Sequence, residues 1–338
     1  MLLDPTTPHP FSPYVAILGR GKTKQRHLTY EEAHASMRMI LAEEALPEQV
    51  GAFLMLLRLK EEAPEEIAGF AQATRDLLDL PTEMPQVDLD WSSYAGKRIQ
   101  LPWFMLSVMV LVARGKRVVM HGTEGHTAGR MYTRPIVEML GLPVATSMRA
   151  AAKQVESGGF SYIPLEVMSP VLRKLIELRP IFGLRSPVHS FTRMIDPFNA
   201  PAVMQGIFHR GFMDIHSGAA RILNFDSASV FRGEGGEIER RPNKPTQVWM
   251  TKGDGEPIVE TWPALLDDGH APADEEMNPQ RLISVWAGED QDEYALASVL
   301  GTLAVTLRTM GEAASVEEAE ALARDYWDAR DRNYLKAQ

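Results

Sequence analysis

KRVVMHGTEGHTAGRMYTRPIVEMLG, residues 116–141, contains a short apolar strand, a polar turn at His121 and Gly122, and then an amphipathic helix. In α/β proteins such a turn is where phosphates are held, because its amides and the N-terminus of the next helix converge on an anion. We therefore expect an α/β layer that carries an anion site at this turn.

The composition is that of an ordinary globular protein. The chain has 338 residues, 45% of them hydrophobic, which is enough for one large or two moderate domains. The absence of cysteine excludes disulfides and thiolate metal sites. Residues 1–14 contain no secretory signal, and their prolines predict an extended arm. The longest apolar run, residues 101–113, is too short to cross a bilayer and predicts a buried helix, so we expect a cytoplasmic protein without a membrane partner.

Three short helices are predicted near the N-terminus. Thr29 to Glu32 has the spacing of a capping box, and an apolar face follows it. Pro47 and Pro64 suit the first turns of a second and a third helix. These segments together predict a small helical bundle.

Beyond Pro81 and Pro85, helical and strand-like runs alternate, which predicts an α/β layer of mixed, partly parallel strands flanked by helices. The expected strands are residues 117–120, 203–208, 229–231 and 246–250. The expected helices are residues 101–113, 130–140, 170–178, 212–223, 295–310 and 316–334.

Two parts of the chain together resemble the anthranilate phosphoribosyltransferase family, within glycosyltransferase family 3. They are the His-Gly turn and the helical sequence LTYEEAHASMRMILAEEALPEQVGAFLMLLRLKEEAPEEIAGFAQATRDL. The resemblance implies a small all-α N-terminal domain and a large α/β domain of the nucleoside phosphorylase/phosphoribosyltransferase type, the class III phosphoribosyltransferase fold. It places the helical domain at residues 1–85, joined by about 168–195, and the glycosyltransferase-like domain at 86–167 and 196–338. It also implies a homodimer formed through the helical domain.

The chain departs from this family at the loop that holds pyrophosphate. The enzymes carry Gly-Thr-Gly-Gly-Asp there and wrap the diphosphate of phosphoribosyl pyrophosphate with backbone amides. This chain reads DWSSYAGKRIQLPWFM and keeps only Gly96, followed by Lys97 and Arg98. The resemblance therefore implies a degenerate pyrophosphate loop, in which Lys97 and Arg98 would have to hold a phosphate by charge.

Other family positions are partly retained as candidate phosphate and ligand sites. At the turn the residues that keep donors near a helix N-terminus are His121, Gly122, Thr123, His126 and Thr127. Alternatively, His121 only ends the strand by bonding the backbone. The segment PVLRKLIELRPIFGL resembles the one that supplies a substrate-facing arginine, at Arg173 or Arg179.

A carboxylate pair in the family holds magnesium on the diphosphate. Here FRGEGGEIERRP places Glu237 at the Glu position, while Gly236 replaces the Asp and Glu234 lies three residues earlier. Magnesium prefers oxygen ligands in near-octahedral geometry, so Glu234 and Glu237 are the candidate Mg²⁺ ligands. The alternative is a charged turn without metal.

Arg185, His189 and Arg193, together with ILGRGK near the N-terminus and RGEGGE later, make the chain similar to the YbiB-type branch of the family, which is associated with nucleic-acid binding. The candidate nucleic-acid contacts are Arg20, Lys22, Lys24, Arg26, Arg185 and Arg193. The first four lie in ILGRGKTKQR, which could equally be a solvated loop. The formal net charge of −10 argues against polyanion binding by the whole surface, so such binding would need a local basic groove.

Two classes of function follow, and a structural or regulatory protein is a third alternative. The first is a non-catalytic protein that binds phosphate-rich ligands, such as single-stranded DNA or RNA, without sequence specificity. The second is a divergent magnesium-dependent glycosyl transferase, pentosyl or phosphoribosyl, that uses phosphoribosyl pyrophosphate and an acceptor other than anthranilate. The degenerate loop favours the first class, because pyrophosphate departure needs its developing charge stabilised.

Overall fold

A seven-stranded sheet forms the centre of the computed structural model, which describes residues 7–21, 23–274 and 276–336. The strand order is β3-β2-β1-β4-β5-β6-β7. The first five strands in this order are parallel and the last two are antiparallel. The strands are β1 Leu89–Ser93, β2 Val118–Gly122, β3 Phe160–Pro164, β4 Val203–Ile207, β5 Ala228–Arg232, β6 Thr246–Thr251 and β7 Ile258–Trp262. This mixed, mostly parallel sheet with flanking helices confirms the predicted fold class.

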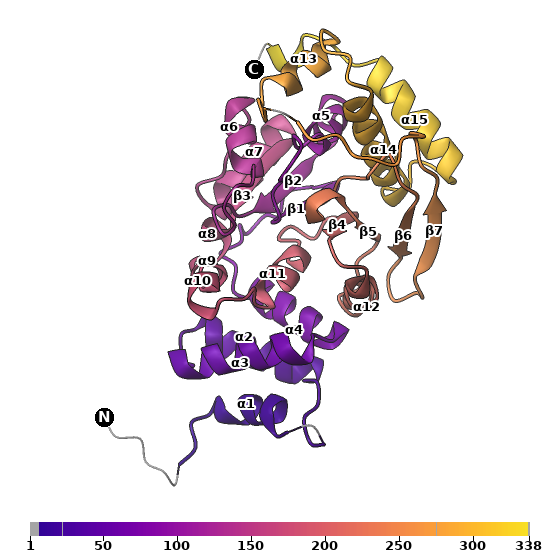
Figure 1. Ribbon diagram of the computed structural model, residues 1–338. Helices are drawn as coiled ribbons and strands as arrows, with labels where there is room; N and C mark the ends of the chain where they lie inside the picture. The colour runs from indigo at the N-terminus through magenta and orange to yellow at the C-terminus, as the bar shows by residue number, and fades with distance from the viewer. Residues whose placement is uncertain (1–6, 22, 275, 337–338) are drawn as a thin grey trace.

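Helices cover both faces of the sheet and build a separate layer at one end (Figure 1). Those of the N-terminal half are α1 Ser12–Gly19, α2 Tyr30–Leu41, α3 Pro47–Lys60, α4 Pro64–Arg75, α5 Phe104–Ala113, α6 Thr133–Met139, α7 Met148–Gly158 and α8 Leu165–Met168. Those that follow are α9 Pro170–Ile176, α10 Arg179–Phe182, α11 Val188–Phe191, α12 Met213–Ile222, α13 Arg281–Ala287, α14 Glu293–Thr309 and α15 Val316–Asp328. The short 3-10 turns are η1 Thr192–Met194, η2 Arg210–Phe212, η3 Glu234–Gly236 and η4 Tyr334–Lys336.

The two faces of the sheet pack into different hydrophobic clusters, because successive side chains of a strand point to opposite faces. Val118 and Met120 of β2 belong to the cluster that contains α5 and α14. Val119, between them, belongs to the cluster that joins the sheet to α2, α3 and α4. The sheet is therefore buried on both sides, as strands in a parallel arrangement usually are.

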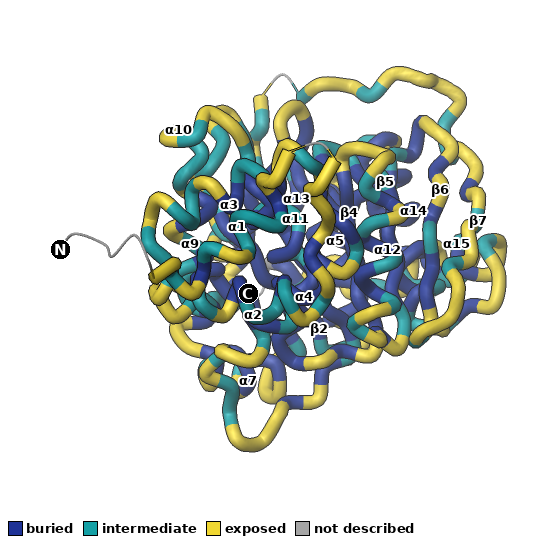
Figure 2. Tube along the Cα trace, turned by 90° about the horizontal axis from the view of Figure 1, so that it is seen from below, coloured by how far each residue is buried: buried dark blue, intermediate teal, exposed yellow. Residues whose placement is uncertain are grey.

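The helical end packs against the sheet through α4, which contacts α2, α11 and α12. Figure 2 views this end from below, where buried stretches fill the middle of the view and exposed ones its outline. Helices α9 to α11 share the hydrophobic cluster of α2 to α4, although α9 begins about a hundred residues later in the chain. The domain boundaries given above stay a prediction.

Most local expectations are confirmed. The Thr29–Glu32 capping box is complete, and α3 and α4 begin at Pro47 and Pro64. The extended arm is wrong for residues 12–14, which form the first turn of α1, where Pro13 costs no intrahelical hydrogen bond. The last helix ends at Asp328 instead of residue 334. In the described part of the chain, no helix is both long and apolar enough to span a membrane.

Candidate functional site

The carboxyl ends of β1, β2, β4 and β5 meet at one edge of the sheet. The parallel register pairs Ser93 with Gly122 and Ile207 with Arg232, so the turns that follow these strands lie side by side. Gly122 is required by this packing, because a Cβ there would lie 2.0 Å from the carbonyl oxygen of Ser93. In open α/β sheets ligands bind at this edge.

The turn after β1 forms a small nest of backbone amides, and the carboxylate of Glu237 occupies it. Glu237 Oε1 accepts hydrogen bonds from the amides of Ala95 at 2.6 Å and Gly96 at 2.5 Å. Its other oxygen accepts one from the hydroxyl of Ser93 at 2.8 Å. Gly96 has a φ of 68°, the left-handed conformation that turns successive amides toward one anion. The anion held here is thus the chain's own carboxylate.

Two glycines, Gly206 in β4 and Gly233 after β5, let Glu237 reach this nest. A Cβ on Gly233 would lie 1.6 Å from the carbonyl oxygen of Glu237, and one on Gly206 would lie 2.2 Å from it. The backbone of Glu237 therefore passes directly over β4. Glu234, three residues earlier, is partly exposed, and its side chain makes no hydrogen bond or ion pair with the described residues.

Lys97 faces the interior rather than the sheet edge. It is 1% exposed and pairs with Glu239, whose second oxygen accepts the amide hydrogen bond of Phe104 at 2.9 Å. Burial raises the pKa of Glu239, and the charge of Lys97 opposes that rise. Arg98, the next residue, is exposed. The structure therefore does not bring these two predicted phosphate ligands together.

His121 is fully buried, and both of its ring nitrogens have partners. Nδ1 lies 2.8 Å from the hydroxyl of Tyr94, and Nε2 lies 3.2 Å from Asp90. Because Nε2–H donates to the carboxylate of Asp90, Nδ1 accepts from the hydroxyl of Tyr94. Burial raises the pKa of Tyr94 well above its ordinary value, so the phenol keeps the proton that it donates. His121 bonds side chains rather than the backbone, which differs in detail from the alternative given above.

The loop after β2 is where three predicted arginines converge. Arg173 donates to the hydroxyl of Thr123. Arg179 donates to the hydroxyl of Thr127 at 2.6 Å, and Arg185 donates to the same oxygen at 3.2 Å. The structure thus brings together residues predicted from separate stretches of sequence, and their role in binding a ligand stays a prediction.

His126 completes this loop as a neutral side chain. Its Nε2 lies 2.8 Å from the carbonyl oxygen of Tyr94, which can only accept, so Nε2 carries the proton. Nδ1 then accepts from the hydroxyl of Thr127 at 3.1 Å. Burial lowers the pKa of His126 to about 4, and nearby arginines contribute to this lowering. The positive charge of the site therefore comes from arginine alone.

Four arginines at this edge, Arg130, Arg179, Arg185 and Arg193, are called the arginine cluster below. Arg179 and Arg185 share the hydroxyl of Thr127, and Arg130 and Arg193 reach the adjacent residues Gly235 and Gly236. Burial lowers the pKa of Arg185, and the charges of the other three add to this lowering. Arg130 and Arg193 donate to backbone carbonyls, among them those of Gly235 and Gly236. No member makes an ion pair with an acidic side chain in the described ranges.

The cluster makes no direct ion pair with a carboxylate of the described residues, although the charge of Glu237 acts on Arg193, and this contrasts with other arginines of the same molecule. Arg281 binds three aspartates and Arg134 binds three glutamates. A chain with a net charge of −10 has ample carboxylates to neutralise the cluster. Adjacent guanidinium groups that make no direct ion pair with a carboxylate are an arrangement that proteins use to bind phosphate and other anions.

The N-terminal basic segment lies apart from the arginine cluster. Arg20, Lys24 and Arg26 are exposed, and Arg26 pairs with Glu32 at 2.6 Å. Lys22 lies outside the described residues. The segment is linked to the end of α3, because His27 contacts Lys60. It therefore borders the helical end rather than the sheet edge.

The carboxylates needed for magnesium are not grouped here. In the ranges that the structure describes, no cluster of three or more histidine, aspartate or glutamate residues could hold a metal ion. Glu237 is held by three donors, so Glu234 and Glu237 in this arrangement do not offer a free carboxylate pair. The magnesium site stays a prediction, and it would require Glu237 to leave the nest.

Sequence reasoning missed Arg130. It was assigned to the helix after the turn, whereas α6 begins only at Thr133, so Arg130 belongs to the turn and reaches the nest. Its nearness to Gly129 was the available signal, because glycine commonly ends a loop. The contribution of Glu237 as an occupant of the nest had no signal in the local sequence.

Comparisons with known proteins agree with the resemblance. Residues 13–77 match the helical bundle domain of the glycosyl transferase family. The chain is 28% identical over 250 residues to an anthranilate phosphoribosyltransferase of Synechococcus sp. (strain CC9902), covering 73% of this chain and 70% of the relative. It is 26% identical over 328 residues to that of Parvibaculum lavamentivorans, covering 93% of this chain and 92% of the relative.

Solved structures show the same fold over the whole chain. Anthranilate phosphoribosyltransferase from Thermus thermophilus superposes with a TM-score of 0.78 at 21% identity, covering 97% of each chain. The Saccharomyces cerevisiae enzyme in complex with PRPP and Mg gives 0.76 at 16% identity, covering 98% of this chain and 96% of that one. The resemblance to the anthranilate phosphoribosyltransferase-like proteins is thus confirmed, and the YbiB-type branch stays a prediction.

Proposed function

We propose that this protein binds phosphate-rich ligands at the arginine cluster, with single-stranded nucleic acid as the ligand and without sequence specificity. The observation that carries the proposal is the convergence of Arg130, Arg179, Arg185 and Arg193 through shared contacts with Thr127 and with the adjacent carbonyls of Gly235 and Gly236, without an ion pair to a carboxylate of the described residues. Backbone phosphates would supply the missing negative charge, and guanidinium groups bind them with two donors each.

The occupied nest supports a degenerate pyrophosphate loop. A diphosphate would have to displace Glu237 from the amides of Ala95 and Gly96, and a negative charge beside the nest would then repel it. Lys97, already paired with Glu239, could not compensate. We therefore expect this chain not to convert anthranilate and phosphoribosyl pyrophosphate into their adduct.

The test is a fluorescence-anisotropy titration of a labelled single-stranded oligonucleotide at several salt concentrations. Affinity should fall steeply with salt, and Arg185→Ala should weaken binding and reduce the slope of log K against log salt by about 0.7, the value for one phosphate contact on a single strand. Arg281→Ala is the matched control, since that arginine is paired and lies outside the cluster. Absence of binding at low salt would refute the proposal.

A second candidate is a divergent transferase that moves a pentosyl or phosphoribosyl group from phosphoribosyl pyrophosphate to an acceptor other than anthranilate. It is favoured by the alignment with anthranilate phosphoribosyltransferases over 93% of this chain and by the fold shared with a structure that holds PRPP and Mg. Glu234 and Glu237 would hold Mg²⁺, which would neutralise the leaving diphosphate. Calorimetric titration with phosphoribosyl pyrophosphate, with and without Mg²⁺, separates the two candidates. Magnesium-dependent binding would favour the transferase.

A homodimer through the helical end is part of the proposal. Large apolar side chains are exposed there, with Leu59 of α3 84% exposed and Ile181 of α10 77% exposed. Such residues on one end of a molecule commonly mark an interface. Light scattering after size exclusion should give twice the mass of 37.7 kDa. A monomer at micromolar concentration would argue against the dimer.

A further inference from the structure

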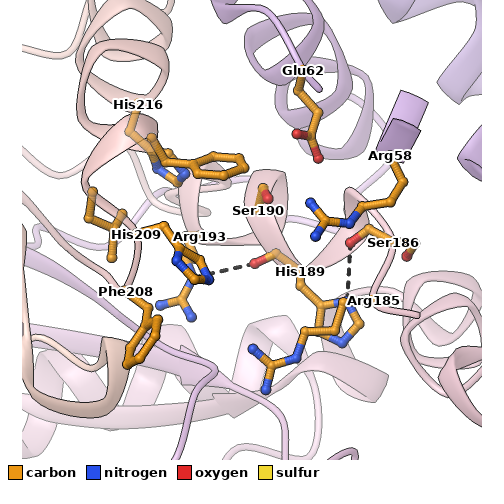
Figure 3. A pocket seen from close by; sticks show the side chains of 12 residues that line it. Arg58, Glu62, Arg185, Ser186, His189, Ser190, Arg193, Phe208, His209 and His216 are labelled. Carbon is orange, nitrogen blue, oxygen red and sulfur yellow. Dashed lines mark hydrogen bonds between the residues drawn. The ribbon is translucent and has the colours of Figure 1, made fainter. Parts of the chain in front are cut away.

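A second feature of the same edge is a pocket between the helical end and the sheet, shown in Figure 3. Its volume is about 130 Å³. Arg58 and Glu62 enter it from the helical end, at the end of α3 and just beyond, while Phe208 follows β4. The segment that runs from the end of α10 into η1 supplies Arg185, Ser186, His189, Ser190 and Arg193. Pockets for drug-sized ligands are several times larger, so this one has room for a single ring system or a small group.

Three polar atoms of the lining have no hydrogen-bond partner among the described residues. They are Glu62 Oε2, Ser186 Oγ and His189 Nε2. Glu62 is 4% exposed and Ser186 is 5% exposed, so water of the outer surface does not satisfy them. Buried polar groups are nearly always paired, so this set needs polar partners inside the cavity, either ordered water or a polar ligand that displaces it.

The tautomer of His189 determines which hydrogen-bonding group that ligand must have. Nδ1 lies 3.2 Å from the carbonyl oxygen of Ser186, which can only accept, so Nδ1 carries the proton. Burial lowers the pKa of His189 to about 3, and the ring is neutral at physiological pH. Nε2 is therefore an acceptor, and it calls for an N–H or O–H donor on the ligand.

The charged and aromatic residues of the lining restrict the class of ligand further. The guanidinium groups of Arg185 and Arg193 and the ring of Phe208 lie around one space in Figure 3. Phe208 is 48% exposed, a large apolar ring that the fold itself does not cover. Bases of single strands stack on such rings in nucleic-acid-binding proteins. An aromatic face, cations and an acceptor together match a nucleotide whose base carries an amine.

We propose that this pocket holds the base of one nucleotide of the bound strand, with the ring against Phe208 and its exocyclic amine donating to His189 Nε2, while Arg185 and Arg193 bind the neighbouring phosphate outside the pocket. The inference rests on the proposed function, because the arginine cluster brings the strand to the pocket. It adds that the protein binds bases as well as phosphates and that it favours bases with an amine.

The experiment compares labelled strands of about ten nucleotides that share the same phosphates but differ in base: oligo-dC, oligo-dT and an abasic strand. Wild-type protein should bind oligo-dC about tenfold more tightly than the abasic strand, the range of one stacked base. It should bind oligo-dC about fivefold more tightly than oligo-dT, the range of one hydrogen bond.

Two variants assign these preferences to the pocket. Phe208→Leu should remove the preference for oligo-dC over the abasic strand while leaving binding of the abasic strand unchanged, and His189→Leu should remove the preference for dC over dT. Tyr14→Leu, which replaces a partly exposed aromatic residue on α1, is the matched control and should keep both preferences.

The outcomes separate the two proposals. If every strand, including the abasic one, fails to bind wild-type protein, the proposed function is wrong. If the abasic strand binds as tightly as oligo-dC, the strand is bound by its phosphates alone and the base pocket is refuted. If a variant does not fold, wild-type protein can be tested instead, by comparing how well dCMP and inorganic phosphate each displace the labelled strand. Equal competition at equal concentration would also refute the base pocket.

Discussion

Removing the carboxylate of Glu237 should destabilise the protein and at the same time open the nest to an external anion. Three donors point at this side chain, the amides of Ala95 and Gly96 and the hydroxyl of Ser93. Each buried donor left without an acceptor costs about 1–3 kcal/mol. Glu237→Ala should therefore lower the free energy of unfolding by roughly 3–5 kcal/mol, allowing for partial relaxation and water entry.

Pyrophosphate should restore part of that loss in the variant and have little effect on wild-type protein. A ligand at about a hundred times its dissociation constant adds about 2.7 kcal/mol to the free energy of unfolding. Urea unfolding followed by tryptophan fluorescence, with and without pyrophosphate, measures both effects. Glu234→Ala is the matched control, because that side chain makes no hydrogen bond in the described structure.

Two results would refute the reasoning about Glu237. If Glu237→Ala were as stable as Glu234→Ala, the carboxylate would not be held in the nest. If pyrophosphate stabilised wild-type protein as much as the Glu237 variant, the chain's own carboxylate would not be an obstacle to the diphosphate, and the transferase candidate would gain support.

Three further predictions concern buried groups. Lys97→Met should cost about 3–5 kcal/mol of unfolding free energy by leaving Glu239 without its cation, and adding Glu239→Gln should recover most of it in a double-mutant cycle in urea. Burial raises the pKa of Glu62 to about 7 from 4.5, so the stability it contributes is complete below pH 4.5 and is lost as the pH rises through 7. As the pH rises from about 5 to about 8, the free energy of unfolding of Glu62→Gln, measured in urea, should rise by up to about 3 kcal/mol relative to that of wild type. A difference between the two proteins that does not change with pH would contradict this. Gly233→Ala should cost at least about 3 kcal/mol, because its Cβ would lie 1.6 Å from a carbonyl oxygen, and a melting temperature equal to wild type would contradict the close approach.

Local features of the fold could be predicted because their physical causes lie within a few residues. The capping box joins Thr29 to Glu32, three residues away, and Pro47 and Pro64 fix backbone angles at their own positions. The apolar run at residues 101–113 predicted a buried helix, and α5 is buried along nearly its whole length. The donors after the His-Gly turn placed Thr127 among the candidates. The family resemblance, rather than a local pattern, placed Arg179 and Arg185 there.

The roles of charged residues could not be predicted, because their partners lie far away in sequence. Lys97 was expected to hold a phosphate, yet it pairs with Glu239, 142 residues later. Glu237 was expected to hold magnesium, yet it binds the amide of Gly96, 141 residues earlier. Whether a charge faces a ligand or is neutralised inside depends on which segments meet when the parallel strands align at one edge of the sheet. Composition and spacing determined the helices, the strands and the number of cationic residues. The assembly of the sheet determined which of those cations are left without an ion pair, because a Coulomb interaction depends on distance in space and not on distance along the chain.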